Sequence, residues 1–173
     1  VDGIPHDPAI VYALLPNGVR CAAQRNDQPA DKVVLRLRVD GGSLDETDDQ
    51  RGIAHLLEHL AFGATTLDPD GRMIQRLQKQ GLAFGAHTNA HTSFDETVYK
   101  LELPDAKPAT LQDGLATIAA QVGGLLLKDD EIARERGVVL AEMRDRDSPE
   151  YRIWVAQATA AYAGTVIAER MPI

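Results

Sequence analysis

The segment His55-Leu56-Leu57-Glu58-His59 constrains this chain more than any other stretch. If the segment is helical, its two histidines lie about 40° apart on one face, because an α-helix turns about 100° per residue. Their β-carbons are then roughly 5–6 Å apart, so one zinc ion can accept both imidazoles. Glu58 lies about 60° from His55, which suits a base beside the metal better than a third ligand. The segment therefore predicts most of a zinc hydrolase site. The competing interpretation is a buried helix with two incidental histidines.

Length and composition limit the classes of protein that this chain can be. Its 173 residues are 44% hydrophobic, which is enough for one core and too few for two ordinary domains. The 18 basic and 26 acidic residues give a net charge of −8 without a basic cluster, so no nucleic acid partner is expected. The longest apolar stretch, residues 115–127, is shorter than the roughly 18 residues of a membrane span, so no span is expected. A single cysteine, Cys21, excludes an internal disulfide and a thiolate-rich zinc site.

Five segments show the patterns that are typical of strands. Asn17-Gly18 between two apolar runs is a strong signal for a tight hairpin. The third segment alternates apolar and polar residues, as a half-buried strand does, and the last two are rich in threonine or alternate in the same way. The expected strands are residues 10–15, 19–24, 32–40, 83–92 and 97–103.

Helices are expected mainly after the first three strands. The helix of the histidine segment should stop at Gly63, and further helices should cover residues 73–81, 109–127, 129–147 and the segment from Ser148 onward. Asp129 or Asp130 can cap the fourth helix, and Ser148 followed by Pro149 is a typical start for the last. Paired strands followed by a bank of helices predict an α+β fold, an antiparallel sheet with helices on one face.

A catalytic zinc site needs a third protein ligand and one open position for water. Glu135 and Glu142 are seven residues apart, so they share one helix face within about 20° and either can reach a metal. Arginines surround both glutamates, and the competing interpretation is therefore a solvated, charged helix face. These arginines are Arg134, Arg136, Arg144 and Arg146.

His87 and His91 are also four residues apart, but they lie in an expected strand. Four residues of a strand span about 13 Å, which is too far for two imidazoles to share one zinc ion. We therefore predict that neither histidine is a ligand.

The order of these motifs resembles the pitrilysin/insulinase family of zinc peptidases, the inverzincins. The resemblance rests on His55-x-x-Glu58-His59 followed by Glu135-x-x-Val-Val-x-x-Glu142. Gly41-Gly42-Ser43 before the histidine segment and residues 89–99 after it stand in the order of the family. The resemblance covers nearly the whole chain and is greatest to the bacterial, periplasmic, pitrilysin-like peptidases. It implies a metallohydrolase module of the mitochondrial-processing-peptidase-like type.

The resemblance also implies a role for each site residue. His55, His59 and Glu142 would bind one zinc ion, and Glu58 would be the general base that activates a water molecule. Glu135 would be a supporting catalytic acid that holds the ligand geometry from outside. The function implied is a zinc-dependent endopeptidase.

A substrate-binding strand follows from the same resemblance. Residues 86–91 would form an exposed edge to which an extended peptide adds as a further strand, with Asn89 fixing its register. The implied substrate-binding residues are Ala86, Asn89, Ala90 and His91, and relatives often have an aromatic residue at the last of these positions. The competing interpretation is an ordinary edge strand protected by polar side chains.

Family members close two similar halves around the substrate, and the second half supplies an arginine and a tyrosine. Residues 1–173 are therefore expected to be a single, incomplete N-terminal module, excised from a longer chain and without its closing strands. Its partner would be the C-terminal half of the same longer chain or a homologous subunit, in the bacterial periplasm. One alternative is a non-catalytic assembly subunit of the same fold. A second, an S-ribosylhomocysteine lyase, requires a downstream cysteine ligand, whereas Cys21 lies upstream.

Overall fold

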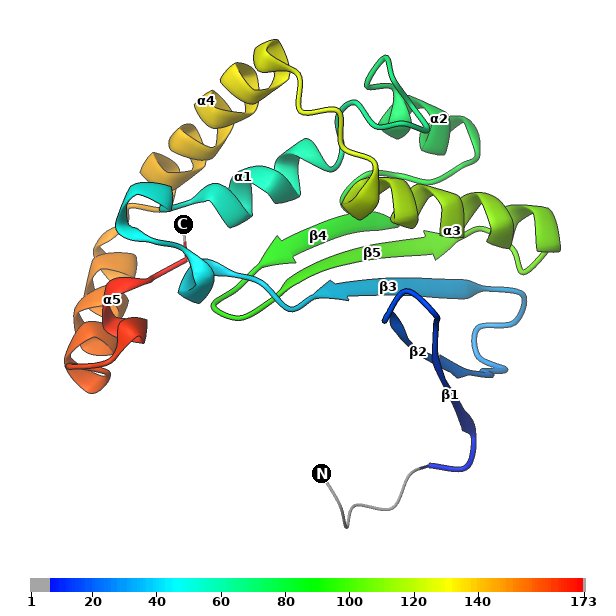
Figure 1. Ribbon diagram of the computed structural model, residues 1–173, viewed down its shortest axis with the longest axis horizontal. Coiled ribbons are helices and arrows are strands. Elements are labelled where there is room, and N and C mark those ends of the chain that lie inside the picture. Colours follow the sequence, from blue (N-terminus) through cyan, green and yellow to red (C-terminus); the bar gives the residue numbers. More distant parts are fainter. Residues whose placement is uncertain (1–6, 173) are drawn as a thin grey trace. The chain divides into compact units, whose positions relative to one another are not determined.

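The computed structural model describes residues 7–172, which form two compact units that divide after Lys32. The first unit contains a hairpin of β1 (Ile10–Leu14) and β2 (Arg20–Gln24), which pair antiparallel (Figure 1). The Val19 amide donates to Asn17 Oδ1 at 3.2 Å, and Gly18 has a φ of +87°, a conformation that glycine adopts without strain. The predicted Asn-Gly hairpin is confirmed.

The second unit contains a three-stranded antiparallel sheet in the order β3-β5-β4. The strands are β3 (Val33–Val39), β4 (Thr88–Thr92) and β5 (Thr97–Leu103). Alternate residues of β5 from Thr97 to Leu103 are buried, as expected for a central strand with one face against helices. β4 therefore lies at one edge of the sheet.

The helices of the second unit are α1 (Ile53–Leu60), α2 (Met73–Lys79), α3 (Pro108–Gly123), α4 (Asp129–Asp145) and α5 (Pro149–Ala161), with short 3₁₀ helices η1 (Ser43–Asp45), η2 (Asp48–Gln50) and η3 (Val166–Glu169). Within this unit, α1, α2 and α3 lie on one side of the sheet (Figure 1). The core between sheet and helices contains Met73, Leu77, Leu82, Leu101, Leu103 and Ile118. The predicted α+β class is confirmed. No described helix is long and apolar enough to cross a membrane.

Two helices, α1 and α3, end three or four residues earlier than the sequence predicts, whereas α2 and α4 end within two residues of the prediction. α1 ends at Leu60, three residues before Gly63, because the buried carboxylate of Glu131 accepts the amide of Ala64 at 2.9 Å and draws the chain away. α3 ends at Gly123 and not at residue 127, because residues 124–126 pair with the loop after α1. Gly124 O accepts the amide of Thr66 at 2.7 Å, which a continuing helix would prevent.

The cap of α4 and the start of β4 also differ from the prediction. α4 begins at Asp129 and its N-cap is Lys128, so Asp129 and Asp130 lie in the first turn instead of capping the helix. β4 begins at Thr88, because Gly85, with a φ of +84°, closes a turn in which its amide donates to Thr88 O at 2.8 Å. The predicted cap of α5 is confirmed, since Ser148 Oγ accepts the amide of Tyr151 at 3.1 Å.

Candidate metal centre

The position of α1 is set by a residue that precedes it. The carboxylate of Glu46 accepts the amide of Gly52 through Oε2 and that of Ala54 through Oε1, both at 2.9 Å. The first amides of a helix have no partner inside the helix, so Glu46 caps α1 from outside. Arg170 Nε donates to the Glu46 carbonyl at 2.7 Å and holds this capping residue in turn.

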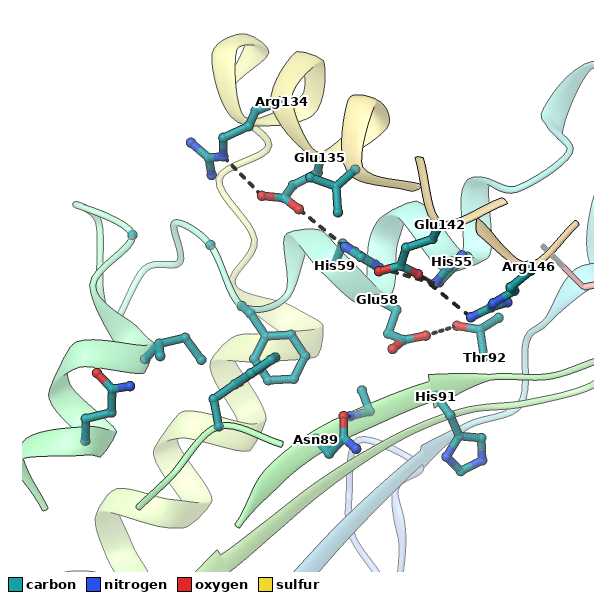
Figure 2. Close-up of a pocket in the computed structure, with 18 residues that line it drawn as sticks. His55, Glu58, His59, Asn89, His91, Thr92, Arg134, Glu135, Glu142 and Arg146 are labelled. Carbon is teal, nitrogen blue, oxygen red and sulfur yellow. Dashed lines mark hydrogen bonds and ion pairs between the residues drawn. The ribbon is translucent and has the colours of Figure 1, made fainter. Parts of the chain in front are cut away.

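Side chains of α1 and α4 meet on the side of α1 that faces the cavity (Figure 2). The Nε2 atoms of His55 and His59 are 3.2 Å apart. Glu142 Oε2 lies 3.6 Å from His55 Nε2, and Glu142 Oε1 lies 3.6 Å from His59 Nε2. The three side chains form a group that can hold a metal ion, called here the His-His-Glu group.

The spacing within the His-His-Glu group fits a tetrahedral metal ion. Bonds of about 2.0–2.1 Å at tetrahedral angles separate two ligand atoms by about 3.3–3.4 Å. The distances of 3.2 and 3.6 Å lie on either side of this value. Two imidazoles and one carboxylate are also a donor set of catalytic zinc sites. The residues present therefore fit zinc.

The second nitrogen of each imidazole has different surroundings. His59 Nδ1 lies 3.3 Å from Glu135 Oε2, and Glu135 Oε1 accepts from Arg134 Nε at 3.1 Å. Because a carboxylate accepts the proton on Nδ1, the lone pair of His59 Nε2 is directed at the group. His55 Nδ1 is buried and has no hydrogen-bond partner among the described residues. Burial, followed by the charge of His59, lowers the pKa of His55 and favours the neutral imidazole that a metal needs.

Glu58 is buried beside the His-His-Glu group and contacts the sheet (Figure 2). Its Oε2 accepts a hydrogen bond from Thr92 Oγ1 at 2.6 Å. Burial raises the pKa of Glu58, and the Thr92 hydrogen bond opposes this effect. A carboxylate whose protonated form is favoured in this way is a better proton acceptor than an exposed glutamate.

A cavity of about 760 Å³ opens over α1, α4 and β4. Three of the four predicted substrate-binding residues, Asn89, Ala90 and His91, line it together with the metal-centre residues. The prediction that the edge strand begins at Ala86 is wrong, because Ala86 lies in the turn closed by Gly85 and does not line this cavity. The ring of His91 is 61% exposed and points away from the His-His-Glu group in Figure 2. His87 Nδ1 accepts the Ala83 amide at 3.0 Å, and this histidine does not line the cavity.

Three residues of the site were not predicted from the sequence. Arg134 contacts Glu135, and Arg146 NH2 lies 3.8 Å from Glu142 Oε2. The spacing of four residues between Glu142 and Arg146 was a usable signal, which the sequence analysis assigned to the competing interpretation of a solvated, charged face. Thr92 is 34 residues from Glu58 and carries no local signal of the contact.

The match to a known family agrees with this geometry. The family model of the insulinase peptidases, peptidase family M16, matches residues 21–165. The chain belongs to this family. The Probable zinc protease PqqL of Haemophilus influenzae is 36% identical over 172 residues, which cover 99% of this M16 chain and 19% of that relative. The chain therefore spans about a fifth of the length of this relative.

Other M16 relatives agree in fold. The crystal structure of the first half of the periplasmic protease PqqL from Escherichia coli has a TM-score of 0.92 at 33% identity, covering 98% of this chain and 36% of that chain. A probable mitochondrial-processing peptidase subunit beta of Arabidopsis thaliana is 34% identical over 80% of this chain and 24% of the relative. The predicted resemblance to pitrilysin-like and mitochondrial-processing-peptidase-like modules is confirmed.

Proposed function

We propose that this chain is the zinc-bearing module of an M16 metalloendopeptidase that cleaves extended peptides. The observation that carries the proposal is the convergence of the His-His-Glu group beside the buried carboxylate of Glu58. Membership of the M16 family and the name of the Haemophilus relative, a probable zinc protease, support it.

In this proposal His55, His59 and Glu142 hold the metal. When bound, zinc supplies a Lewis acid that polarises a peptide carbonyl and makes a water molecule more acidic. Glu135 keeps the tautomer of His59 that directs Nε2 at the metal, and its own second oxygen is held by Arg134.

Glu58 acts as the general base. Thr92 occupies Oε2, so Oε1 is the oxygen that takes the proton from the attacking water. The same carboxyl group then returns the proton to the leaving amine. The raised pKa of Glu58, caused by burial, suits a group that both accepts and donates a proton.

The substrate peptide adds to the open edge of β4. Glu102 N donates to His87 O and Ser93 N donates to Glu96 O, at 2.7 and 2.8 Å. In an antiparallel pair, only every second residue directs its backbone N–H and C=O at the neighbouring strand. His87 and Ser93 do so here, so the backbone groups of the even-numbered residues Ala90 and Thr92 point to the open edge. A peptide strand can pair with these two residues largely independently of its sequence. Asn89 Oδ1 accepts the Ala90 amide at 2.9 Å and must release it when the peptide binds.

A partner half and a compartment belong to the same proposal. Because the chain spans about a fifth of the Haemophilus relative, we propose that residues 1–173 are one module of a longer two-halved protease. The partner is the C-terminal half of the same chain or a homologous subunit, which closes over the substrate strand. The E. coli relative is described as periplasmic, which supports a periplasmic location here.

Elemental analysis beside peptide hydrolysis tests the proposal. We expect one zinc ion per chain after dialysis against zinc at neutral pH, its loss in His59→Ala, and its retention in the matched control His87→Ala. Glu58→Gln should keep the metal and abolish any hydrolysis of a quenched-fluorescence peptide. A chain that binds no zinc would contradict the metal site. Bound zinc with hydrolysis that is the same in Glu58→Gln would favour the alternative, a non-catalytic assembly subunit.

A further inference from the structure

One hydrogen bond joins the sheet to the base on α1. Thr92, the last residue of β4, donates from Oγ1 to Glu58 Oε2 at 2.6 Å (Figure 2). This distance is in the range of a hydroxyl that donates to a charged oxygen, which is shorter than an ordinary O–H···O bond. The carboxylate of Glu58 is therefore held from β4 as well as from its own helix.

Two acceptors lie near the single hydroxyl proton of Thr92, Glu58 Oε2 and Thr97 Oγ1. Thr97 is opposite Thr92 in the β4–β5 register, and the two Oγ1 atoms are 3.3 Å apart. Thr97 Oγ1 donates its single proton to Gly41 O at 3.0 Å. Thr97 Oγ1 can therefore only accept from Thr92, which has one proton to donate. Glu58 Oε2 is the nearer acceptor and a carboxylate oxygen, so it takes this proton in preference to Thr97.

The end of β4 is also fixed relative to the segment that leads into α1. The amides of Ser43 and Leu44 donate to the carbonyls of Ser93 and Phe94, at 3.0 and 2.9 Å. Gly42 permits this approach, because a β-carbon there would lie 2.7 Å from the carbonyl carbon of Phe94. The turn after Thr92 and the entry to α1 are therefore joined by two backbone hydrogen bonds.

We propose that Thr92 is a positioning residue for the general base, and this inference rests on the proposed peptidase function. The terminal torsion of a glutamate is broad, so a carboxylate held only by its helix samples several orientations. The Thr92 hydroxyl selects one of them and leaves Oε1 for the proton of the attacking water. Thr92 acts through Glu58, so its loss slows the chemical step and leaves peptide binding largely intact.

Isosteric substitutions separate positioning from packing. Thr92→Val keeps the volume and removes the hydroxyl, whereas Thr92→Ser keeps the hydroxyl. Thr88→Val is the matched control, since Thr88 is buried on the same face of β4 and lies outside the cavity lining. Zinc content, thermal midpoint and single-turnover hydrolysis of a quenched-fluorescence peptide, with protein in excess, are measured for each.

Thr92→Val should lower the maximal rate about 10–100-fold with one zinc per chain and a half-saturating concentration within about twofold. The maximal rate of Thr92→Ser should stay within about threefold of that of the unsubstituted protein, and the maximal rate of Thr88→Val should equal that of the unsubstituted protein. A Thr92→Val protein with the full maximal rate would overturn the inference. If Thr92→Val lost its zinc or its fold, the rate of Thr92→Ser would test the inference instead. A zinc-loaded Thr92→Ser protein with a low maximal rate would overturn the positioning role of Thr92.

A readout without catalysis comes from the metal-free protein. In a double-mutant cycle of Thr92→Val and Glu58→Gln, the shifts in thermal midpoint should not add, because both substitutions break one contact. Additive shifts would contradict the contact. Failure of the proposed function has a different signature, since Glu58→Gln would then leave hydrolysis unchanged. If Glu58→Gln abolished hydrolysis and Thr92→Val left the rate unchanged, only the positioning role of Thr92 would be overturned.

Discussion

The two glutamates of α4 have different neighbours, and these neighbours decide what each carboxylate can do. Glu142 lies 3.6 Å from the Nε2 atoms of both His55 and His59. Glu135 lies on the far side of the His59 ring, next to Nδ1, and is held by Arg134. We therefore propose that Glu142 enters the coordination shell of the metal and that Glu135 orients the ligand His59.

We predict that Glu142→Gln weakens zinc binding more than Glu135→Gln does. Loss of an outer partner of a ligand typically costs about 10–100-fold in metal affinity, and loss of a ligand costs more. The matched pair changes the same atom on the same helix, and competition with a chromophoric chelator measures both affinities. Equal losses, or a larger loss in Glu135→Gln, would reverse the roles of the two residues.

Tyr99 gives a second prediction for single residues, on stability at high pH. Burial, followed by the charge of Glu58, raises the pKa of Tyr99 to about 12. An unfolded tyrosine titrates near pH 10, so the unfolded chain loses this proton first. The stability that the neutral phenol contributes is complete below about pH 10 and is lost as the pH rises toward 12. The decrease is about 2–3 kcal/mol in the free energy of unfolding.

The substitution Tyr99→Phe should remove this alkaline decrease, because phenylalanine does not ionise. Denaturant unfolding from pH 9 to 12 measures the free energy of unfolding of Tyr99→Phe and of the unsubstituted protein at each pH. Tyr162→Phe is the control. The Tyr162 side chain is 47% exposed, so this substitution should not change how the free energy of unfolding varies with pH. An alkaline slope that is the same in Tyr99→Phe would show that this phenol stays accessible to water.

At the scale of elements, α1 is too short to be stable by itself. It has eight residues, and isolated helices of fewer than about 12 residues are marginal in water. Glu46 caps its first turn, and residues 42–44 bind the turn between β4 and β5. The helix that carries two of the proposed metal ligands therefore depends on segments that contribute no proposed ligand.

Two glycine substitutions should shift stability in opposite directions. Gly42→Ala would bring a β-carbon against the carbonyls of Ser93 and Phe94 and should cost roughly 1–3 kcal/mol of unfolding free energy.

Gly137→Ala lies inside α4, where an added β-carbon meets no described atom within 4 Å, and should stabilise by about 0.5–1 kcal/mol. Denaturant unfolding measures both effects. A neutral Gly42→Ala would mean that the β4–β5 turn can move away from α1.

At the scale of the whole molecule, the proposed partner half governs activity. The proposed metal group, base and substrate edge all lie within residues 33–173. Donors to the oxyanion of the reaction are expected from the second half, as the family resemblance implies. Loss of one such donor typically costs about 10²–10³ in rate.

We therefore predict that the zinc-loaded 173-residue chain alone hydrolyses peptides at least about 100-fold more slowly than the longer protein. Hydrolysis of one quenched-fluorescence peptide is compared at equal zinc content, with Glu58→Gln of each protein as the control for background. Equal rates that both depend on Glu58 would contradict the requirement for a second half and would leave the metal site unaffected.

Several features were determined by the sequence alone, because they depend on contacts within a few residues. The helical spacing of His55 and His59 follows from the turn of a helix, and it presents both imidazoles on one face. The Asn17-Gly18 hairpin and the Ser148 cap depend on side chains that bond to their own neighbouring backbone. Such features form in any tertiary structure that contains the helix or the turn, because they depend only on neighbouring residues.

Only the tertiary structure decided which distant groups meet. The spacing of Glu135 and Glu142 allowed either one to face the metal, and their separation into two roles came from the packing of α4 against α1. The end of α1 was set by the Glu131 carboxylate on α4, and the end of α3 by pairing with the loop after α1. The contact of Thr92 with Glu58 joins residues 34 positions apart. These contacts have no local pattern, because they exist only once the sheet and helices are packed together.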